Sequence, residues 1–488
     1  MNKVLMIGID GLDPILLSKL ENKLPNFKKL REEGISIKLE SIYPYDSIPI
    51  WSSIYTGLTP ARHGLLKPIN YLKEDDVDIN TNILSGRTFW DFASSAGKKV
   101  CIINPFVAYP PWQVNGVMVS GPLGKEGVPQ AFPQTILDTY KIPHLGGIHG
   151  KYPLKKDLTK FRERAEKITL DETDFALKIL KDYEWDLAFT CFITLDGVEH
   201  FFWRYYDDED PTHPDNNPFE NVIIDFYKLF DKIVGKFTAL DYDTILIFSD
   251  HGFGMRSVKL VNINEILREK RFLVSKAKNQ NNPVNMFEKV KSKLLDFIYK
   301  HDLDDLALEL SRFVPTVSKK IQKSSFSIDF KQSMAYTSDL VGMNPCGGIN
   351  IVAENMGKLN YEEVRTLILK EISELKDPDT GKRLMKWLCR REELYSGEYI
   401  SDYPDIIFEL EDGYGVNWSI HTPLISNCYA HKIISGGHKR DATFMIEGVG
   451  EDKIVRSDMT SVDIAPTVLD LLDIKGYFNF DGHSLFVE

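Results

Sequence analysis

Two aspartate–histidine pairs have the residue types and spacing of metal ligands. Asp250 and His251 are adjacent and leave a short apolar run. Asp196 and His200 are four residues apart, so both side chains share one face if the segment is helical. Carboxylate oxygen and imidazole nitrogen both suit zinc or a similar divalent ion. A local Asp–His hydrogen bond is the alternative for the second pair, and Glu199, between its members, is expected to point elsewhere.

Three further residues are candidates for the same chemistry. Asp10 follows an apolar run, where it could also be a loop-capping acid, and His438 follows glycines, where a lone histidine could be structural. Ser47 precedes an apolar helical pattern. A hydroxyl at a helix N-terminus lies at the positive end of the dipole, which favours an alkoxide or a phosphate, although a plain N-cap serine also fits.

Together these residues predict a site with two metal ions. Such ions, about 3.5–4 Å apart, clamp the attacking and leaving oxygens of an in-line displacement. The predicted ligands of one ion are Asp10, Ser47, Asp250 and His251, and those of the other are Asp196, His200 and His438.

Alternating strands and helices are expected to position these residues. Apolar runs predict buried strands at residues 4–9, 99–104, 187–195, 244–249 and 348–353. Helical patterns lie at residues 25–33, 169–182, 219–240, 361–375 and 461–472. The alternation predicts an α/β fold with a mainly parallel central sheet sandwiched by helices. Because ligands bind beyond the carboxyl ends of parallel strands, Asp10, Asp196 and Asp250 are expected to meet at one edge.

The segment 256–344 differs from the rest of the chain. It carries polar runs and amphipathic stretches between two predicted strands. We interpret it as a mostly helical insertion that either caps the site or simply faces solvent. The chain is then divided into a catalytic domain of residues 1–255 and 345–488 and the insertion of residues 256–344.

Composition limits the class of partner and compartment. The chain has 488 residues, a net charge of −12 and no dense Lys/Arg stripe, so duplex nucleic acid is not expected as a partner. A small phosphate substrate remains compatible, because bound cations reverse the local field. The five cysteines are far apart, without a CxxC pair, which indicates a reducing compartment. No apolar stretch reaches the roughly eighteen residues of a membrane helix, and no signal peptide is indicated. We expect a cytoplasmic protein.

The order of the motifs resembles the alkaline phosphatase superfamily, and within it the type I phosphodiesterase/nucleotide pyrophosphatase family. The resemblance covers nearly the whole chain apart from the insertion. Its main motifs are MIGIDGLDP, SIPIWSSIYTGLTPARHGL, LDGVEHFFWRYYD, IFSDHGFG and SGGHKRDATFMIEG. It implies an alkaline phosphatase-like fold and two divalent ions, usually zinc and sometimes manganese or another metal. Ser47 falls at the family's nucleophilic Thr or Ser, and the family's metal ligands match Asp10, Asp196, His200, Asp250, His251 and His438.

Two positions depart from related patterns. Nucleotide pyrophosphatases have an asparagine that helps to hold a phosphoryl oxygen, and the same register here gives Pro68, with Lys67 and Asn70 nearby. Nucleotide specificity is therefore left open. Sulfatases require an arginine where this chain has Trp51, which argues against a sulfatase.

The resemblance implies a hydrolase that cleaves phosphate esters of small molecules through a phosphoserine on Ser47, most closely a phosphodiesterase. A phosphomonoesterase or phosphonate hydrolase on the same site is the first alternative, and a metal-binding scaffold without catalysis is the second. A monoesterase favours extra positive charge near the third phosphoryl oxygen, and the sequence offers no clear arginine for it. Residues 109–122 and the insertion are expected to shape the pocket. Loop or structural roles are expected for His63, His144, His149 and His213.

Overall fold

The computed structural model divides the chain into two compact units. It describes residues 2–66, 81–122, 128–148, 152–276, 327–338, 344–355, 359–476 and 479–486, together with residue 340 and short pieces between residues 290 and 309. One unit comprises Met1–Gly254 and His438–Glu488, and the other comprises Met255–Gly437. The second unit is thus longer than the predicted insertion, because it also contains residues 345–437, which we had assigned to the catalytic domain.

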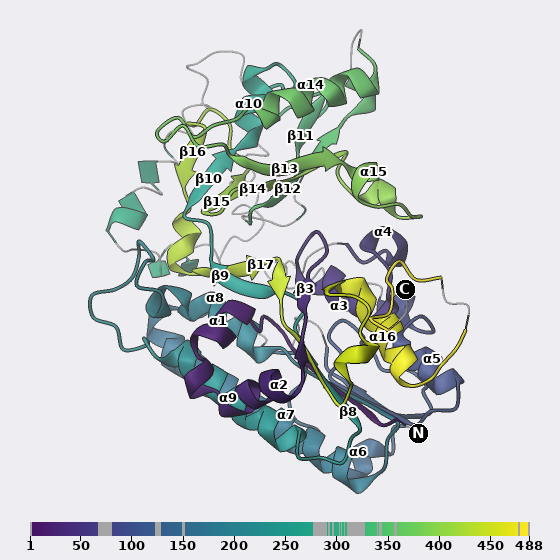
Figure 1. Cartoon of the computed structure of the whole chain (residues 1–488). Helices are drawn as coiled ribbons and strands as arrows, with labels where there is room; N and C mark the ends of the chain where they lie inside the picture. The colour runs from purple at the N-terminus through teal and green to yellow at the C-terminus, as the bar shows by residue number, and fades with distance from the viewer. Residues whose placement is uncertain are drawn as a thin grey trace. The chain divides into compact units, whose positions relative to one another are not determined.

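A sheet of eight described strands is the centre of the first unit (Figure 1). Its order is β2-β19-β8-β1-β7-β4-β5-β6. The inner strands are parallel: β1 (Val4–Ile9), β4 (Val100–Ile103), β5 (Gly116–Ser120), β7 (Leu187–Phe192) and β8 (Thr244–Phe248). The outer strands pair antiparallel: β2 (Ile35–Ser36), β6 (Gln130–Phe132) and β19 (Phe444–Glu447). The mainly parallel sheet is confirmed, and its apolar inner strands are buried on both faces as such sheets require.

Helices cover both faces of this sheet (Figure 1). One group contains α1 (Pro14–Lys19), α2 (Pro25–Glu33), α7 (Leu158–Asp182), α8 (Thr194–Tyr206) and α9 (Val222–Phe237). The opposite group contains α3 (Ser47–Thr56), α4 (Pro60–His63), α5 (Phe89–Ser95) and α16 (Ile464–Leu471). The remaining elements of the first unit include α6 (Ile136–Thr139) and the small sheet of β3 (Lys38–Glu40), β18 (Asp441–Ala442) and β20 (Asp458–Thr460). The stretches β9 (Gly252–Met255) and β17 (Gly436–Lys439) lie where the chain passes from one unit to the other.

The second unit has sheets of its own. One runs in the order β11 (Ala335–Thr337), β12 (Cys346–Ile351), β14 (Ile406–Leu410) and β13 (Met385–Arg390), and all its pairs are antiparallel. The other contains β10 (Lys259–Asn262), β15 (Tyr414–Asn417) and β16 (Ile425–Asn427). Its described helices include α10 (Ile263–Glu269), α14 (Tyr361–Ser373) and α15 (Arg391–Leu394).

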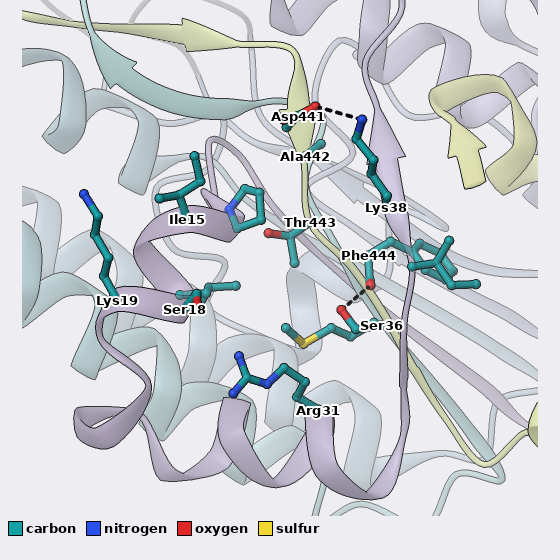
Figure 2. Close-up of a pocket in the computed structure, with 14 residues that line it drawn as sticks. Ile15, Ser18, Lys19, Arg31, Ser36, Lys38, Asp441, Ala442, Thr443 and Phe444 are labelled. Atoms are coloured by element: carbon teal, nitrogen blue, oxygen red, sulfur yellow. Dashed lines mark hydrogen bonds and ion pairs between the residues drawn. The ribbon is translucent and has the colours of Figure 1, made fainter. Parts of the chain in front are cut away.

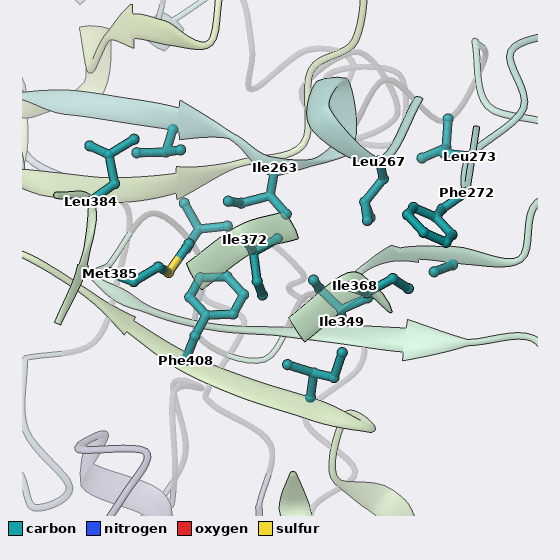
Figure 3. Close-up of a cluster of buried hydrophobic side chains, with 14 of the residues drawn as sticks. Ile263, Leu267, Phe272, Leu273, Ile349, Ile368, Ile372, Leu384, Met385 and Phe408 are labelled. Carbon is teal, nitrogen blue, oxygen red and sulfur yellow. The ribbon is translucent and has the colours of Figure 1, made fainter. Parts of the chain in front are cut away.

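The predicted strand at residues 348–353 therefore exists, as β12, but it does not belong to the central parallel sheet. Figure 3 shows the reason: Ile349 packs in a separate apolar core with Ile368 and Ile372 of α14 and Phe408 of β14. An apolar run in the sequence predicts that a strand is buried, but it does not predict to which sheet the strand belongs.

The predicted mostly helical character of residues 256–344 is met only in part. The described residues of this segment include strands β10 and β11 as well as helix α10, and residues 277–289 and 310–326 lie outside the described part. Within the part of the chain that the structure describes, no helix is long and apolar enough to cross a membrane. All five cysteines are free in the structure.

Candidate metal centre

The first predicted set of residues meets at the carboxyl edge of the central sheet. Asp10 follows β1 directly, and its backbone N–H donates to Phe192 O at 2.8 Å. The chain then turns through Gly11, whose φ of 78° suits a glycine. Asp250 and His251 follow β8, and Ser47 is the first residue of α3. The structure thus brings together residues separated by about half of the chain.

The atoms of this first set face one another at short distances. His251 Nε2 lies 3.5 Å from Asp10 Oδ1 and 3.3 Å from Asp250 Oδ2. Ser47 Oγ lies 3.2 Å from His251 Nε2 and 3.5 Å from Asp10 Oδ1. One ligand atom from each of Asp10, Asp250 and His251 lies within 4.8 Å of the other two, and all three residues are buried.

The second predicted set forms beside the first. Asp196 and His200 lie one turn apart on α8, as their spacing predicted, and Nε2 of His200 is 3.3 Å from Asp196 Oδ1. His438 joins them from β17, with its Nε2 at 3.2 Å from Asp196 Oδ1 and 3.1 Å from His200 Nε2. The His251 ring stacks on the His438 ring with centroids 3.7 Å apart, so the two sets adjoin.

Backbone carbonyls fix the orientation of two imidazoles. Nδ1 of His251 is 3.1 Å from Gly252 O, and Nδ1 of His438 is 3.1 Å from Tyr45 O. A carbonyl oxygen only accepts, so each Nδ1 carries the proton and each Nε2 is left to face the carboxylates. This is the arrangement in which a histidine presents its Nε2 lone pair to a metal ion.

Burial sets the protonation of the first set. Burial and the neighbouring charges of Asp250 and Asp196 raise the pKa of Asp10 well above its ordinary value. Burial, assisted by the charge of Asp196, raises the pKa of Asp250 to about 7. Burial and the nearby His438 lower the pKa of His251 well below its ordinary value. The charge of His438 lowers the pKa of Asp250 but does not offset the effect of burial, so both carboxylates need further positive charge to be stable in the ionised form.

The second set is balanced differently. Burial alone would raise the pKa of Asp196, but His200 and His438 outweigh it and the pKa lies well below its ordinary value. Burial likewise opposes a charge on His438, yet contact with Asp196 raises its pKa. In this set a proton on an imidazole supplies the positive charge that the carboxylate needs.

Divalent metal ions fit both sets. In the first set, carboxylate oxygens and Nε2 of His251 face one another as acceptors, and Asp250 Oδ2 accepts no hydrogen bond from the residues that the structure describes. In the second set, Nε2 of His200 and of His438 faces Asp196 Oδ1, where a metal ion would replace a shared proton. Buried acceptors without donors are costly, and a divalent cation would satisfy them all. Asp196, His200 and His438 give three protein ligands with one open position, which is the donor arrangement of a catalytic zinc site; in the first set, Ser47 Oγ would be the fourth ligand beside Asp10, Asp250 and His251.

Two contacts near the site were not predicted from the sequence: the one between Trp51 and Asp10, and the one between Glu199 and Tyr227. Trp51 Nε1 donates to Asp10 Oδ2 at 2.9 Å, and its only sequence signal is a position one turn after Ser47. Glu199 does point away from Asp196 and His200, as expected, and accepts from Tyr227 OH at 3.0 Å. That tyrosine is in turn 3.0 Å from the backbone N–H of Asp13 in the turn after β1.

The remaining histidines have structural contacts where they are described. His63 accepts from the backbone N–H of Leu65 at Nδ1, so its Nε2–H donates to Ser53 Oγ at 2.9 Å. Burial lowers the pKa of His63 to about 3. His144 Nε2 and His213 Nδ1 contact backbone carbonyls at 2.8 and 3.0 Å. His149, Lys67, Pro68 and Asn70 lie outside the described residues.

A cavity of about 490 Å³ lies elsewhere in the first unit, between α1, α2 and the strands β2 and β19 (Figure 2). None of the predicted site residues lines it. Arg31 pairs with Glu21, and Lys38 lies 3.8 Å from Asp441, so two of its basic side chains are already neutralised.

Comparisons with known proteins agree with this fold. The chain is similar to the crystal structure of phosphonoacetate hydrolase from Sinorhizobium meliloti 1021 in complex with phosphonoformate, at 12% identity and a TM-score of 0.57, with 97% of this chain and 95% of that chain covered. It is also similar to human ectonucleotide pyrophosphatase/phosphodiesterase 5, at 12% identity and a TM-score of 0.52, with coverages of 98% and 97%. At these identities the likeness shows an alkaline phosphatase-like fold. A comparison with curated proteins found no match.

A family model settles the relationship at the level of sequence. The model for type I phosphodiesterase/nucleotide pyrophosphatase matches residues 4–423, which is most of the chain. The protein therefore belongs to the type I phosphodiesterase/nucleotide pyrophosphatase family, whose members hydrolyse phosphoric esters.

Proposed function

We propose that the protein hydrolyses phosphate diesters of small molecules, with Ser47 as nucleophile and two divalent ions, zinc in the first instance, as cofactors. One ion is assigned to Asp10, Ser47, Asp250 and His251, and the other to Asp196, His200 and His438. The observation that carries the proposal is the position of Ser47 Oγ, 3.2 Å from His251 Nε2 and 3.5 Å from Asp10 Oδ1 at the start of α3. His438 lies beyond the matched residues 4–423, so its assignment rests on its contact with Asp196.

The chain's own residues position the reaction. Ser47 Oγ loses its proton and attacks phosphorus, one P–O ester bond breaks, and the leaving alcohol takes up a proton. Ser47 then carries the phosphoryl group with its second ester group still attached; water breaks the bond between phosphorus and Ser47 Oγ, releases a phosphate monoester and restores the hydroxyl. The N-terminus of α3 favours negative charge at the phosphoryl group. Asp10 and His251 hold Ser47 Oγ from two sides. Bound metal ions would lower the pKa of the serine hydroxyl and neutralise charge that develops on the phosphoryl oxygens.

The test compares Ser47→Ala with Ser52→Ala. Ser52 belongs to the same helix, but its hydroxyl donates to Ile48 O and takes no part in the site. We expect Ser47→Ala to reduce bis(p-nitrophenyl) phosphate turnover by orders of magnitude with metal content nearly unchanged, and Ser52→Ala to resemble the wild type. Wild type quenched in acid during turnover of this diester should carry a p-nitrophenyl phosphoryl group on the Ser47 peptide. Wild-type turnover in Ser47→Ala would refute the nucleophile.

A substrate panel distinguishes the diesterase from its alternatives on the same site. Mono- and bis-nitrophenyl phosphate and phosphonoacetate are compared at equal metal loading. Preference for the diester supports the proposal, whereas preference for the monoester or the phosphonate replaces it with a phosphomonoesterase or a phosphonate hydrolase. Full metal content without hydrolysis of any of them would indicate a non-catalytic scaffold. The capping role of residues 256–344 and the cytoplasmic location stay predictions.

A further inference from the structure

Each carboxylate of the first metal set has one oxygen already engaged by a protein N–H group. Asp10 Oδ2 accepts from Trp51 Nε1 at 2.9 Å. Asp250 Oδ1 accepts from the backbone N–H of Gly11 at 3.3 Å. The other oxygens, Asp10 Oδ1 and Asp250 Oδ2, are the ones that face His251 Nε2. The first set therefore offers one oxygen per carboxylate.

We propose that Trp51 is a positioning residue that makes Asp10 a one-oxygen ligand and so biases the first metal position toward ions that take few ligands. This inference rests on the metal site of the proposed function. With Ser47 Oγ, the set supplies two carboxylate oxygens, one imidazole nitrogen and one hydroxyl oxygen. Four ligands of this kind match zinc, whereas calcium takes 6–8 oxygens and magnesium and manganese favour six.

The structure holds the Trp51 indole rigidly in this role. The side chain is fully buried and lies one helical turn after Ser47 on α3, so both residues face Asp10. Its ring packs against Phe189 and Phe248, with centroids 6.4 and 5.9 Å away. On the other side, a Cβ at Gly8 would lie only 2.6 Å from the ring. The indole N–H thus has one available direction, toward Asp10 Oδ2.

A second buried tryptophan provides the matched control. Trp90 is also fully buried and stacks on Phe189, with centroids 6.4 Å apart. Its indole N–H has no hydrogen-bond partner among the described residues. Trp51→Phe and Trp90→Phe therefore remove the same atoms from one aromatic cluster, but only the first removes a donor to a metal ligand.

The experiment titrates zinc and manganese into both metal-free variants and the wild type in competition with a chelating dye. We expect Trp51→Phe to weaken zinc binding at one of the two positions by about 10–100-fold, the usual effect of losing an outer hydrogen bond to a ligand. Manganese binding should weaken less, so that the preference for zinc falls. Trp90→Phe should match the wild type. Equal zinc affinity in both variants, or an equal loss in both, would overturn the role of Trp51.

A measurement on the wild type covers the case in which Trp51→Phe does not fold. With 15N-labelled tryptophan, the indole N–H that bonds to Asp10 should shift on addition of zinc, and the resonance lost in Trp90→Phe should not. An indole spectrum unchanged by bound zinc would also overturn the inference. The outcomes remain distinct from failure of the proposed function: a wild type that binds no metal refutes that function, whereas zinc binding indifferent to Trp51 refutes only this inference.

Discussion

Replacing Asp250 by asparagine should stabilise the metal-free protein above pH 7, although it removes a proposed metal ligand. The pKa of Asp250 rises from an ordinary 3.8 to about 7, chiefly because the group is buried. The ionised form of Asp250 therefore destabilises the folded state when no metal is bound. Asparagine has the same shape and carries no charge.

The sign and size of the effect follow from proton linkage. Below about pH 4 the carboxyl is protonated in both the folded and the unfolded chain, and the substitution changes little. Between about pH 4 and pH 7 the folded chain keeps the proton that the unfolded chain has lost, so the stability of the wild type falls as pH rises. Above about pH 7 the full difference is present. A pKa raised from 3.8 to about 7 corresponds to about 4 kcal/mol.

The surroundings can accept the new amide. Its oxygen can take the hydrogen bond from Gly11 N–H, which now reaches Asp250 Oδ1 at 3.3 Å. Its NH₂ group can donate to His251 Nε2, which lies 3.3 Å from Asp250 Oδ2 and is unprotonated because Nδ1 carries the proton. The amide oxygen and one amide hydrogen then both have partners.

The assay is urea unfolding of chelator-treated wild type and Asp250→Asn at pH 5, 6, 7 and 8, with Asp174→Asn on the exposed face of α7 as the control. The stability gain of Asp250→Asn should grow across this range to a few kcal/mol, whereas the control should stay flat. With zinc present the order should reverse, because Asp250→Asn loses a ligand of the first set and zinc bound at that set stabilises the wild type more than the variant. A gain that does not change with pH, or a loss at pH 8, would refute the reasoning.

Three further predictions concern the same unit. His200→Ala should reduce bound metal from about two ions per chain to about one, measured by elemental analysis; retention of both ions would contradict the second ligand set. His63→Leu removes the partners of Leu65 N–H and Ser53 Oγ and should lower the free energy of unfolding by about 1–3 kcal/mol with metal content unchanged in the refolded protein. Zinc binding at pH 6 should release protons from Asp10 and Asp250, because burial raises both pKa values, and should release fewer at pH 8; calorimetry in buffers of different ionisation enthalpy counts them.

The sequence predicted the part of the fold that has a strong local pattern. The strand at residues 4–9 and the helix at residues 25–33 have the predicted bounds. The four-residue spacing of Asp196 and His200 did place both on one helix face. In each case the spacing of apolar residues, or of the two candidate ligands, is enough to predict the local secondary structure and the face on which the side chains lie.

What the sequence did not predict depends on contacts between distant segments. Strand β12 has an ordinary apolar pattern, and only its pairing with β14 reveals its sheet. The helix predicted at residues 169–182 in fact begins at Leu158. The prediction missed its first half because those residues are mostly polar and exposed to solvent, and so show no clear apolar period. Trp51 resembles any core aromatic residue in an apolar helix until the fold sets its N–H beside Asp10.

The split of the first unit into two stretches has a consequence for its synthesis. All residues of the first metal set have been synthesised once the ribosome has added His251. His438, which belongs to the second set, is added 187 residues later. At about 5–20 residues per second this interval lasts roughly 10–40 s. Strand β19, which covers the edge of β8, is made only after that interval. The nascent chain therefore carries an unpaired apolar strand edge while the second unit is translated, and such edges invite association with other chains. Shielding of the β8 edge during translation should therefore raise the yield of folded protein.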